Sequence, residues 1–224
     1  MPDVPMERRC PRYAIQVPLL HKAGTPQNNP VGIAWTRNLS EGGACVEFST
    51  PLQPELPLVL RLQTDRGAII ASANVVWVGG SGQAGRSVTH GVAFTPLASD
   101  QHRAIQKLVT GGREQARADI RLSFEVSTTC QYAGPPSRPP IEGLTGNISR
   151  GGLLLLLPQV LSAGTFLELM LQTVRGPLTA QGKIVWEESR AGQLLGPPFR
   201  HGFRFTTIGW STLLNLGMLL MLPR

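Results

Sequence analysis

Two pairs of arginines, repeated at one spacing, are the residues in this 224-residue chain best suited to binding chemistry. The first pair is Arg8 and Arg12, and the second, Arg117 and Arg121, lies 109 residues later, so that each spans the pattern R-x-x-x-R. A guanidinium group is a rigid fork of donors that binds phosphate through two hydrogen bonds and stacks on flat rings. Each pair is therefore suited to hold a ligand that is both anionic and planar.

A second polar element, with the pattern N-x-S-x-x-G, follows each arginine pair at the same distance. Its Asn and Ser supply short hydrogen-bonding groups, and its Gly permits a positive φ or the close approach of a ligand. One such element alone is typical of an Asx-type turn that enters a strand. Both elements, in order and twice, predict two nucleotide sites of one kind. The six residues are Asn38, Ser40 and Gly43 in the first copy and Asn147, Ser149 and Gly152 in the second.

The repeat continues through the rest of both halves. Trp77 and Trp186 end similar segments at the offset of 109, whereas His90 and His201 begin similar segments at an offset of 111. The second copy therefore gains two residues between these points, which we expect in a loop. Neither histidine has a nucleophile or metal set beside it in sequence, so we interpret both as residues at a strand entry.

A repeat of about 109 residues is the size of a small domain and is too long for a solenoid unit. We therefore expect two homologous domains, residues 1–110 and 111–224, joined near residues 110–112. With 42% hydrophobic and 16% charged residues, each half can bury a core. The 25 glycines and 19 prolines predict many turns between short strands.

The net charge of +7 favours an anionic partner, such as a nucleotide, a nucleic acid or an anionic surface. No run of five or six basic residues marks a nucleic-acid tail, and the few Tyr and Phe residues offer no stacking platform. These features disfavour a nucleic-acid partner. Ser40 and Ser149 have no base nearby, so we expect no enzyme activity, and nothing in the chain indicates a metal or a resident cofactor.

Three scattered cysteines without C-x-x-C spacing argue against a disulfide framework and a zinc site, and they suit a reducing compartment. The N-terminus lacks a basic-then-apolar signal pattern, and no stretch approaches the roughly 18 apolar residues of a membrane span. We therefore expect a cytoplasmic protein without a membrane span.

Alternation of apolar and polar residues predicts a strand after each arginine pair, from Tyr13 to Val17 and from Leu122 to Val126. With the later segments this makes five to six short strands per half. Such a series indicates an antiparallel sheet closed into a small barrel, which leaves no exposed edge. The other expected strands are 43–48, 56–63, 68–78 and 91–94 in the first half and 152–157, 166–172, 177–187 and 202–205 in the second.

Each half ends in an expected helix. In the first, Ser99 or Asp100 is a suitable N-cap, and the helical stripe is apolar. In the second, we expect Ser211 to cap a helix over residues 212–222, which is apolar nearly all round. That helix could pack between the two domains, which we favour, form a homodimer seam, or bind a partner.

The arginine pair, the N-x-S-x-x-G element, the V-x-W strand and the H-G-x-x-F strand together resemble the PilZ domain, a bacterial cyclic di-GMP receptor module. The resemblance covers about 100 residues of each half and implies a mainly β fold: two small six-stranded antiparallel barrels in tandem, each with a C-terminal helix. It also implies one cyclic di-GMP site per barrel. The arginines would grip phosphate and stack on one guanine, while the Asn, Ser and Gly residues would meet the other guanine and its phosphate.

The two copies differ within this likeness. Arg9 extends the first arginine arm, whereas Ala118 stands at the equivalent place in the second copy, where Arg113 could substitute. Both copies have Asn where Asp is common in the family. Trp77 and Trp186 could cover a base, although we favour a position in the core at the barrel rim.

Two functions follow from this reading. The first is a cyclic di-GMP sensor whose two sites each bind one molecule or a stacked pair. The ligand orders the arginine arms and sets the geometry between the domains, because the second arm is also the linker. The alternative is a non-catalytic adaptor or docking protein in which one or both PilZ-like domains do not bind nucleotide. It would dock a downstream protein, or a second copy of itself, through the apolar C-terminal helix. Two complete arginine pairs favour the sensor.

Overall fold

The structure is a computed structural model that describes residues 10–24, 30–79, 87–114, 120–134, 138–188 and 198–222. Three of the predicted site residues, Arg8, Arg9 and Arg117, lie outside these ranges. The chain forms two compact units, Met1–Ala118 and Asp119–Arg224.

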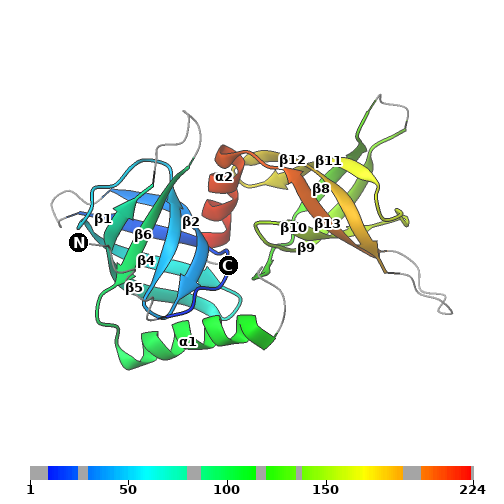
Figure 1. Cartoon of the computed structure of the whole chain (residues 1–224). Helices are drawn as coiled ribbons and strands as arrows, with labels where there is room; N and C mark the ends of the chain where they lie inside the picture. The colour runs from blue at the N-terminus through cyan, green and yellow to red at the C-terminus, as the bar shows by residue number, and fades with distance from the viewer. Residues whose placement is uncertain are drawn as a thin grey trace, which may run out of the picture. The chain divides into compact units, whose positions relative to one another are not determined.

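The first unit is a closed barrel of six antiparallel strands in the order β1-β2-β3-β6-β5-β4 (Figure 1). Every neighbouring pair is antiparallel, including the β1–β4 pair that closes the ring. The strands are β1 (Pro18–Ala23), β2 (Val31–Ser40), β3 (Gly43–Phe48), β4 (Pro57–Thr64), β5 (Gly67–Val78) and β6 (Val88–Phe94).

The second unit repeats this barrel, with strand order β10-β13-β12-β11-β8-β9 closed by pairing of β9 with β10. A short additional strand, β7, pairs with β9. The strands are β7 (Leu122–Ser123), β8 (Ser127–Tyr132), β9 (Ile141–Ile148), β10 (Gly152–Leu157), β11 (Phe166–Thr173), β12 (Gly176–Glu187) and β13 (Phe199–Thr207). The predicted fold of two six-stranded antiparallel barrels is confirmed.

Strand alternation fills each barrel with aliphatic side chains. In β4, Leu58, Leu60 and Leu62 are buried, while Val59 between them is exposed. Residues of one parity line the interior and the others form the outer face, as the pleat of a strand requires. The interior is therefore a packed core, and any ligand site must lie on the outside.

The strand predicted from Tyr13 to Val17 is wrong, because β1 begins only at Pro18. The segment instead runs beside β2 with single contacts, a bridge between Tyr13 and Leu39 and a bond from Val17 N to Thr36 Oγ1. Its second-copy equivalent is also not one strand, since β7 ends at Ser123. Buried and exposed residues alternate along an extended segment even where it forms no continuous hydrogen bonding to a neighbouring strand. The alternating pattern therefore predicted a strand where none forms.

The sequence interpretation also missed β2 and β9, the strands that carry the asparagines of the N-x-S element. Both are interrupted by irregular pairing, between Thr36 and Asn38 in β2 and between residues of β10 that face β9. An extra residue breaks the period of two, so that the apolar alternation by which a strand is recognised is lost.

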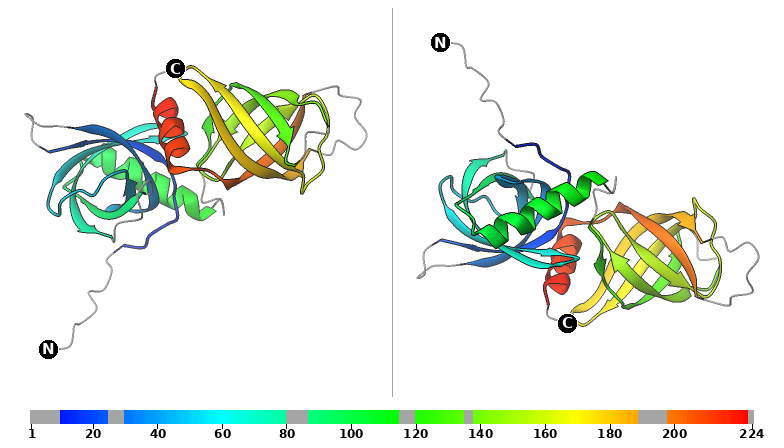
Figure 2. Two further views of the ribbon diagram at one scale, coloured as in Figure 1. Left: turned by 90° about the horizontal axis from the view of Figure 1, so that it is seen from above. Right: turned by 90° about the horizontal axis from the view of Figure 1, so that it is seen from below.

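Helix α1 (Ser99–Glu114) follows the first barrel, contacts β5 and β2, and lies across one end of that barrel (Figures 1 and 2). Ile105 and Val109 are buried on its inner face, as the apolar stripe predicted. The Gln101 side chain accepts a hydrogen bond from Ala98 N at 3.0 Å, which is the contact that the third helical residue makes with an N-cap residue. The N-cap is therefore Ala98, and the predicted N-cap of Ser99 or Asp100 is wrong. The helix runs through residues 110–112, where the sequence suggested the junction.

Helix α2 (Trp210–Met221) follows the second barrel and contacts β12. Its N-cap is Gly209, which makes no side-chain bond, so the prediction that Ser211 caps the helix is wrong. The helix starts one residue before Ser211 because Leu213 N bonds to Gly209 O at 3.0 Å. Neither α1 nor α2, the helices in the described ranges, has the length and hydropathy that crossing a membrane requires.

Candidate nucleotide site on each barrel

A β-bulge on the outer face of the first barrel presents two polar side chains together. Thr36 pairs with Val46 and Leu39 pairs with Ala44, and Val46 and Ala44 belong to the core. Arg37 and Asn38 lie between these pairs and both oppose one residue, Cys45. Two residues opposite one is the definition of a bulge, and it turns both side chains to the face opposite the core.

A second bulge lies on the same row of the sheet, on β5, which is separated from β2 by the two strands β3 and β6. Val75 pairs with Val92 and Trp77 pairs with Gly91, so that Val76 is the extra residue. Gly91 in turn pairs with Cys45. The row thus runs from the β2 bulge across Cys45 and Gly91 to the β5 bulge; we call it the outer row.

Gly91 is what allows the indole of Trp77 to lie flat in the outer row. A Cβ atom at Gly91 would overlap the Nε1, Cε2 and Cδ1 atoms of that ring. Trp77 is 39% exposed, so one side of the indole rests on β6 while part of the ring faces solvent. Our preference for a buried rim tryptophan was therefore wrong for this ring, which is half exposed on the outer face and available for stacking.

The second barrel has the same outer row. Ile148 pairs with Leu153 and Thr145 with Leu155, which leaves Gly146 and Asn147 opposite Leu154. Leu154 pairs with Gly202, and Gly202 pairs with Trp186 after a second register shift. Trp186 is 43% exposed, and its indole overlaps the place of a Cβ at Gly202. Two barrels of one chain thus build the same surface.

Each arginine arm is fixed to its barrel by a buried threonine of the neighbouring strand. Thr36 Oγ1 donates to Ile15 O at 2.7 Å and accepts from Val17 N at 2.9 Å. Thr145, its counterpart 109 residues on, donates to Phe124 O and accepts from Val126 N at 3.0 Å. These bonds fix the residues that follow Arg12 and Arg121, and hence the place where each arm meets its barrel. The sequence reasoning missed both threonines, although their matched spacing could have revealed them.

In the second barrel the structure brings the arginine arm and the N-x-S-x-x-G element together. Arg121 Nη1 donates to Asn147 Oδ1 at 3.2 Å, so one arginine of the arm lies directly against the asparagine of the N-x-S element. In the first barrel, Asn38 Oδ1 is buried and has no hydrogen-bond partner among the described residues. The two sites differ in this detail although their motifs match.

Arg12 of the first arm lies close to the outer row. Burial raises the pKa of the Cys45 thiol, the guanidinium groups of Arg37 and Arg12 oppose that rise, and the carboxylate of Glu47 adds to it. Three charged side chains thus act on the thiol in the middle of the row. Arg12 itself is exposed, which leaves its donors accessible to a ligand.

The serines and glycines of the two N-x-S-x-x-G elements build the turns beside the outer row. Ser40 Oγ donates to Gly43 O at 3.1 Å, and Ser149 Oγ donates to Gly152 O at 3.3 Å. Neither glycine has a positive φ. A Cβ at Gly43 would overlap Val92 O, so this glycine permits close approach of β6. Any ligand contact by these four residues stays a prediction.

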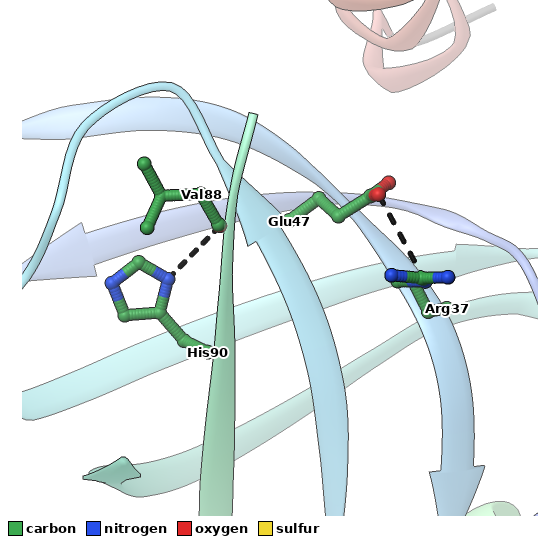
Figure 3. Close-up of polar contacts among 4 residues, drawn as sticks. All are labelled: Arg37, Glu47, Val88 and His90. Carbon is green, nitrogen blue, oxygen red and sulfur yellow. Dashed lines mark hydrogen bonds and ion pairs between the residues drawn. The ribbon is translucent and has the colours of Figure 1, made fainter. Parts of the chain in front are cut away.

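His90 and His201 each connect two backbone segments through hydrogen bonds. His90 accepts from Leu52 N through Nε2 at 2.9 Å and donates from Nδ1 to Val88 O at 3.0 Å, the contact drawn in Figure 3. His201 does the same with Leu161 N and Phe199 O. Burial lowers the pKa of both imidazoles more than these carbonyl bonds raise it. A neutral ring with one donor and one acceptor is the form these contacts require.

No cluster of His, Cys, Asp or Glu suited to a metal ion occurs in the part of the chain that the structure describes. The three cysteines are all free thiols.

The PilZ domain family matches the chain twice, over residues 7–111 and 113–216. The chain therefore belongs to the PilZ family, a family of cyclic di-GMP receptors. A search of curated protein sequences gives no match.

Several solved structures are similar to the chain in fold. The PilZ domain of CeSA from a cellulose-synthesizing bacterium has 20% identity and a TM-score of 0.36, over 46% of this chain and 98% of its own. The PilZ domain of YcgR from Escherichia coli, solved with c-di-GMP, has 16% identity and a TM-score of 0.41, over 50% and 95%. PlzA from Borreliella burgdorferi, in complex with c-di-GMP, has 11% identity and a TM-score of 0.40, over 91% and 87%.

Proposed function

We propose that this chain is a cyclic di-GMP sensor with one nucleotide site on the outer row of each barrel. The observation that carries the proposal is the repetition of that row. In both barrels an asparagine stands at one end, beside the root of an arginine arm, and a half-exposed tryptophan stands at the other. Membership in the PilZ family supports cyclic di-GMP as the ligand.

The chemistry of the row suits this ligand. Arginine forks bind the bridging phosphates and stack on a guanine ring, as planar guanidinium groups do. Asparagine offers both a donor and an acceptor to a guanine edge. The exposed indole offers a flat apolar surface at the far end of the row. The predicted contacts are made by Arg8, Arg9, Arg12, Asn38, Ser40 and Gly43 in the first site and by Arg117, Arg121, Asn147, Ser149 and Gly152 in the second.

Ligand binding acts on the arms. The second arm belongs to the segment between the two units, since Arg121 is the third residue of the second unit. A nucleotide that clamps this arm against Asn147 restricts the link between the units and so sets their relative geometry. The sensor then needs no catalytic step, because a change in domain geometry is its output.

The test is calorimetric titration of the full chain with cyclic di-GMP, with GTP and cyclic AMP as competitors for specificity. Arg12→Ala with Arg121→Ala removes one arm arginine from each site, and we expect at least a tenfold loss of affinity. Arg66→Ala with Arg175→Ala is the matched control, because these exposed arginines hold equivalent turn positions in the two barrels and carry the same total charge.

Unchanged affinity in the Arg12/Arg121 variant would refute the proposed sites. No heat and no binding in the unaltered chain would favour the adaptor function, in which α2 docks a downstream protein or a second copy. Small-angle scattering with and without nucleotide tests the change in geometry separately.

A further inference from the structure

The first outer row carries a third arginine that the second lacks. Arg37 is the bulge residue beside Asn38, and its side chain is 56% exposed. The equivalent bulge residue in the second barrel is Gly146. The bulge therefore displays a guanidinium group next to the predicted ligand residue in one site, and no side chain in the other.

Arg37 is held by one partly buried carboxylate. Its Nε lies 3.9 Å from Glu47 Oε1, and the Glu47 side chain is only 11% exposed (Figure 3). At that distance the two groups attract by charge but do not form a hydrogen bond. A guanidinium that is more than half exposed, with its donors not engaged by this contact, can exchange the carboxylate for a phosphate at small cost.

The surrounding residues change as a set between the two barrels. Cys45 and Glu47 of β3 correspond to Leu154 and Leu156 of β10. Leu154 fills the space that Arg37 would occupy, since a Cβ at Gly146 would lie 2.9 Å from its Cδ2. The first row is therefore polar and charged at its centre, while the second is aliphatic.

We propose that Arg37 is an additional phosphate-binding residue of the first site, held by Glu47 in the free chain and transferred to a ligand phosphate on binding. This inference rests on the proposed function. Arg37 lies in β2, and Arg12 precedes Tyr13, which bridges to Leu39 of the same strand, so two guanidinium groups meet one end of the ligand. The second site takes the same ligand on Leu154 with its arm arginines alone. The two sites thus differ in affinity and in sensitivity to salt.

The experiment isolates the first site in the full chain with Arg121→Ala, and titrates cyclic di-GMP by calorimetry. In this background, Arg37→Ala should weaken binding about tenfold or more, as loss of a charged two-bond contact does. Arg37→Lys should recover part of the loss, because it restores the charge without the fork. Glu47→Gln should strengthen binding several-fold, because it removes the competing carboxylate.

Two controls separate binding from folding. Arg37→Ala combined with Glu47→Gln removes both charges of the pair, and it should bind as weakly as Arg37→Ala while it melts like the parent chain. Arg66→Ala removes the same charge at an exposed turn outside the outer row, and it should leave affinity within twofold.

Equal affinity of Arg37→Ala and its parent, with binding otherwise intact, would show that Arg37 and Glu47 are only a surface ion pair and would overturn the inference alone. If the unaltered chain binds but Arg121→Ala abolishes all binding, the first barrel is no site and the inference also fails. Absence of binding in the unaltered chain overturns the proposed function itself, and this inference with it.

Discussion

His21 in the first barrel should make the stability of this protein fall at acid pH. Replacing His21 and its neighbour Gly32 by the equivalent pair of the second barrel should abolish that contribution. Its ring lies on Gly32, where a Cβ would be 2.6 Å from Nε2, and it packs edge-on against Phe48 at 4.8 Å between centroids. Its Nδ1 is buried without a hydrogen-bond partner among the described residues. Burial lowers the pKa of His21 to about 4.

The sign follows from this lowered pKa. Above pH 6.5 the imidazole is neutral in both the folded and the unfolded chain, so stability is full. As pH falls from 6.5 toward 4, the unfolded chain binds a proton that the folded barrel refuses, and stability is lost. The two pKa values give a loss of about 2 kcal/mol between pH 8 and pH 5, rising to roughly 3 kcal/mol below pH 4.

The second barrel provides the matched replacement. Cys130 and Ile141 lie 109 residues after His21 and Gly32. In the first barrel the large His21 ring faces a glycine, and in the second the small Cys130 side chain faces a large isoleucine. His21→Cys with Gly32→Ile exchanges one natural pair for the other. We expect this double variant to fold and to lose that pH-dependent part, while the contributions of His90 and His201 remain in both proteins.

Urea unfolding at pH 8 and pH 5, for the unaltered and double-variant chains, measures the difference. Imidazole NMR resonances of His21 give its pKa directly. A His21 that titrates at 6.5 or above, or a double variant that loses as much stability at pH 5 as the unaltered chain, would refute the reasoning.

Three further predictions concern the second barrel. Thr145→Val removes the two hydrogen bonds that hold the second arm. We expect the free energy of unfolding to fall by about 1–3 kcal/mol and cyclic di-GMP binding to weaken. A loss of stability with unchanged binding would show that the arm needs no such anchor. Gly202→Ala should displace the Trp186 indole, which a fluorescence shift and reduced affinity would report; an unchanged spectrum contradicts the packing. Burial raises the pKa of Cys130 to about 12, so that thiol should resist alkylation at pH 8 until the protein unfolds, and labelling of the native chain would contradict its burial.

The hydrophobic rhythm of the chain predicted much of this fold. The expected strands 43–48 and 152–157 coincide with β3 and β10, and the expected strand 68–78 begins one residue inside β5. These segments alternate regularly, so local pattern suffices. The failures lie where one extra residue interrupts the alternation, as in β2, and where burial alternates without a ladder, as after Arg12.

Part of the candidate site was also readable from residue types. Arg121 and Asn147 were expected to share a site, and the structure places them in hydrogen-bond contact. The role of Arg37 was not readable, because an arginine before an asparagine in a strand has no special meaning until its neighbours across the sheet are known.

The sequence alone determined that this chain contains two copies of one unit, that each unit is a small barrel, and that each carries an arginine arm and an N-x-S-x-x-G element. Motifs and the alternation of residues in strands are local properties of the chain, so they can be recognised in the sequence alone. Only the tertiary structure decided which residues oppose one another across the sheet. Register depends on pairing between segments distant in sequence, and two bulges on one row bring Asn38, Cys45 and Trp77 into line. That alignment brings residues that are far apart in the sequence into one candidate ligand surface.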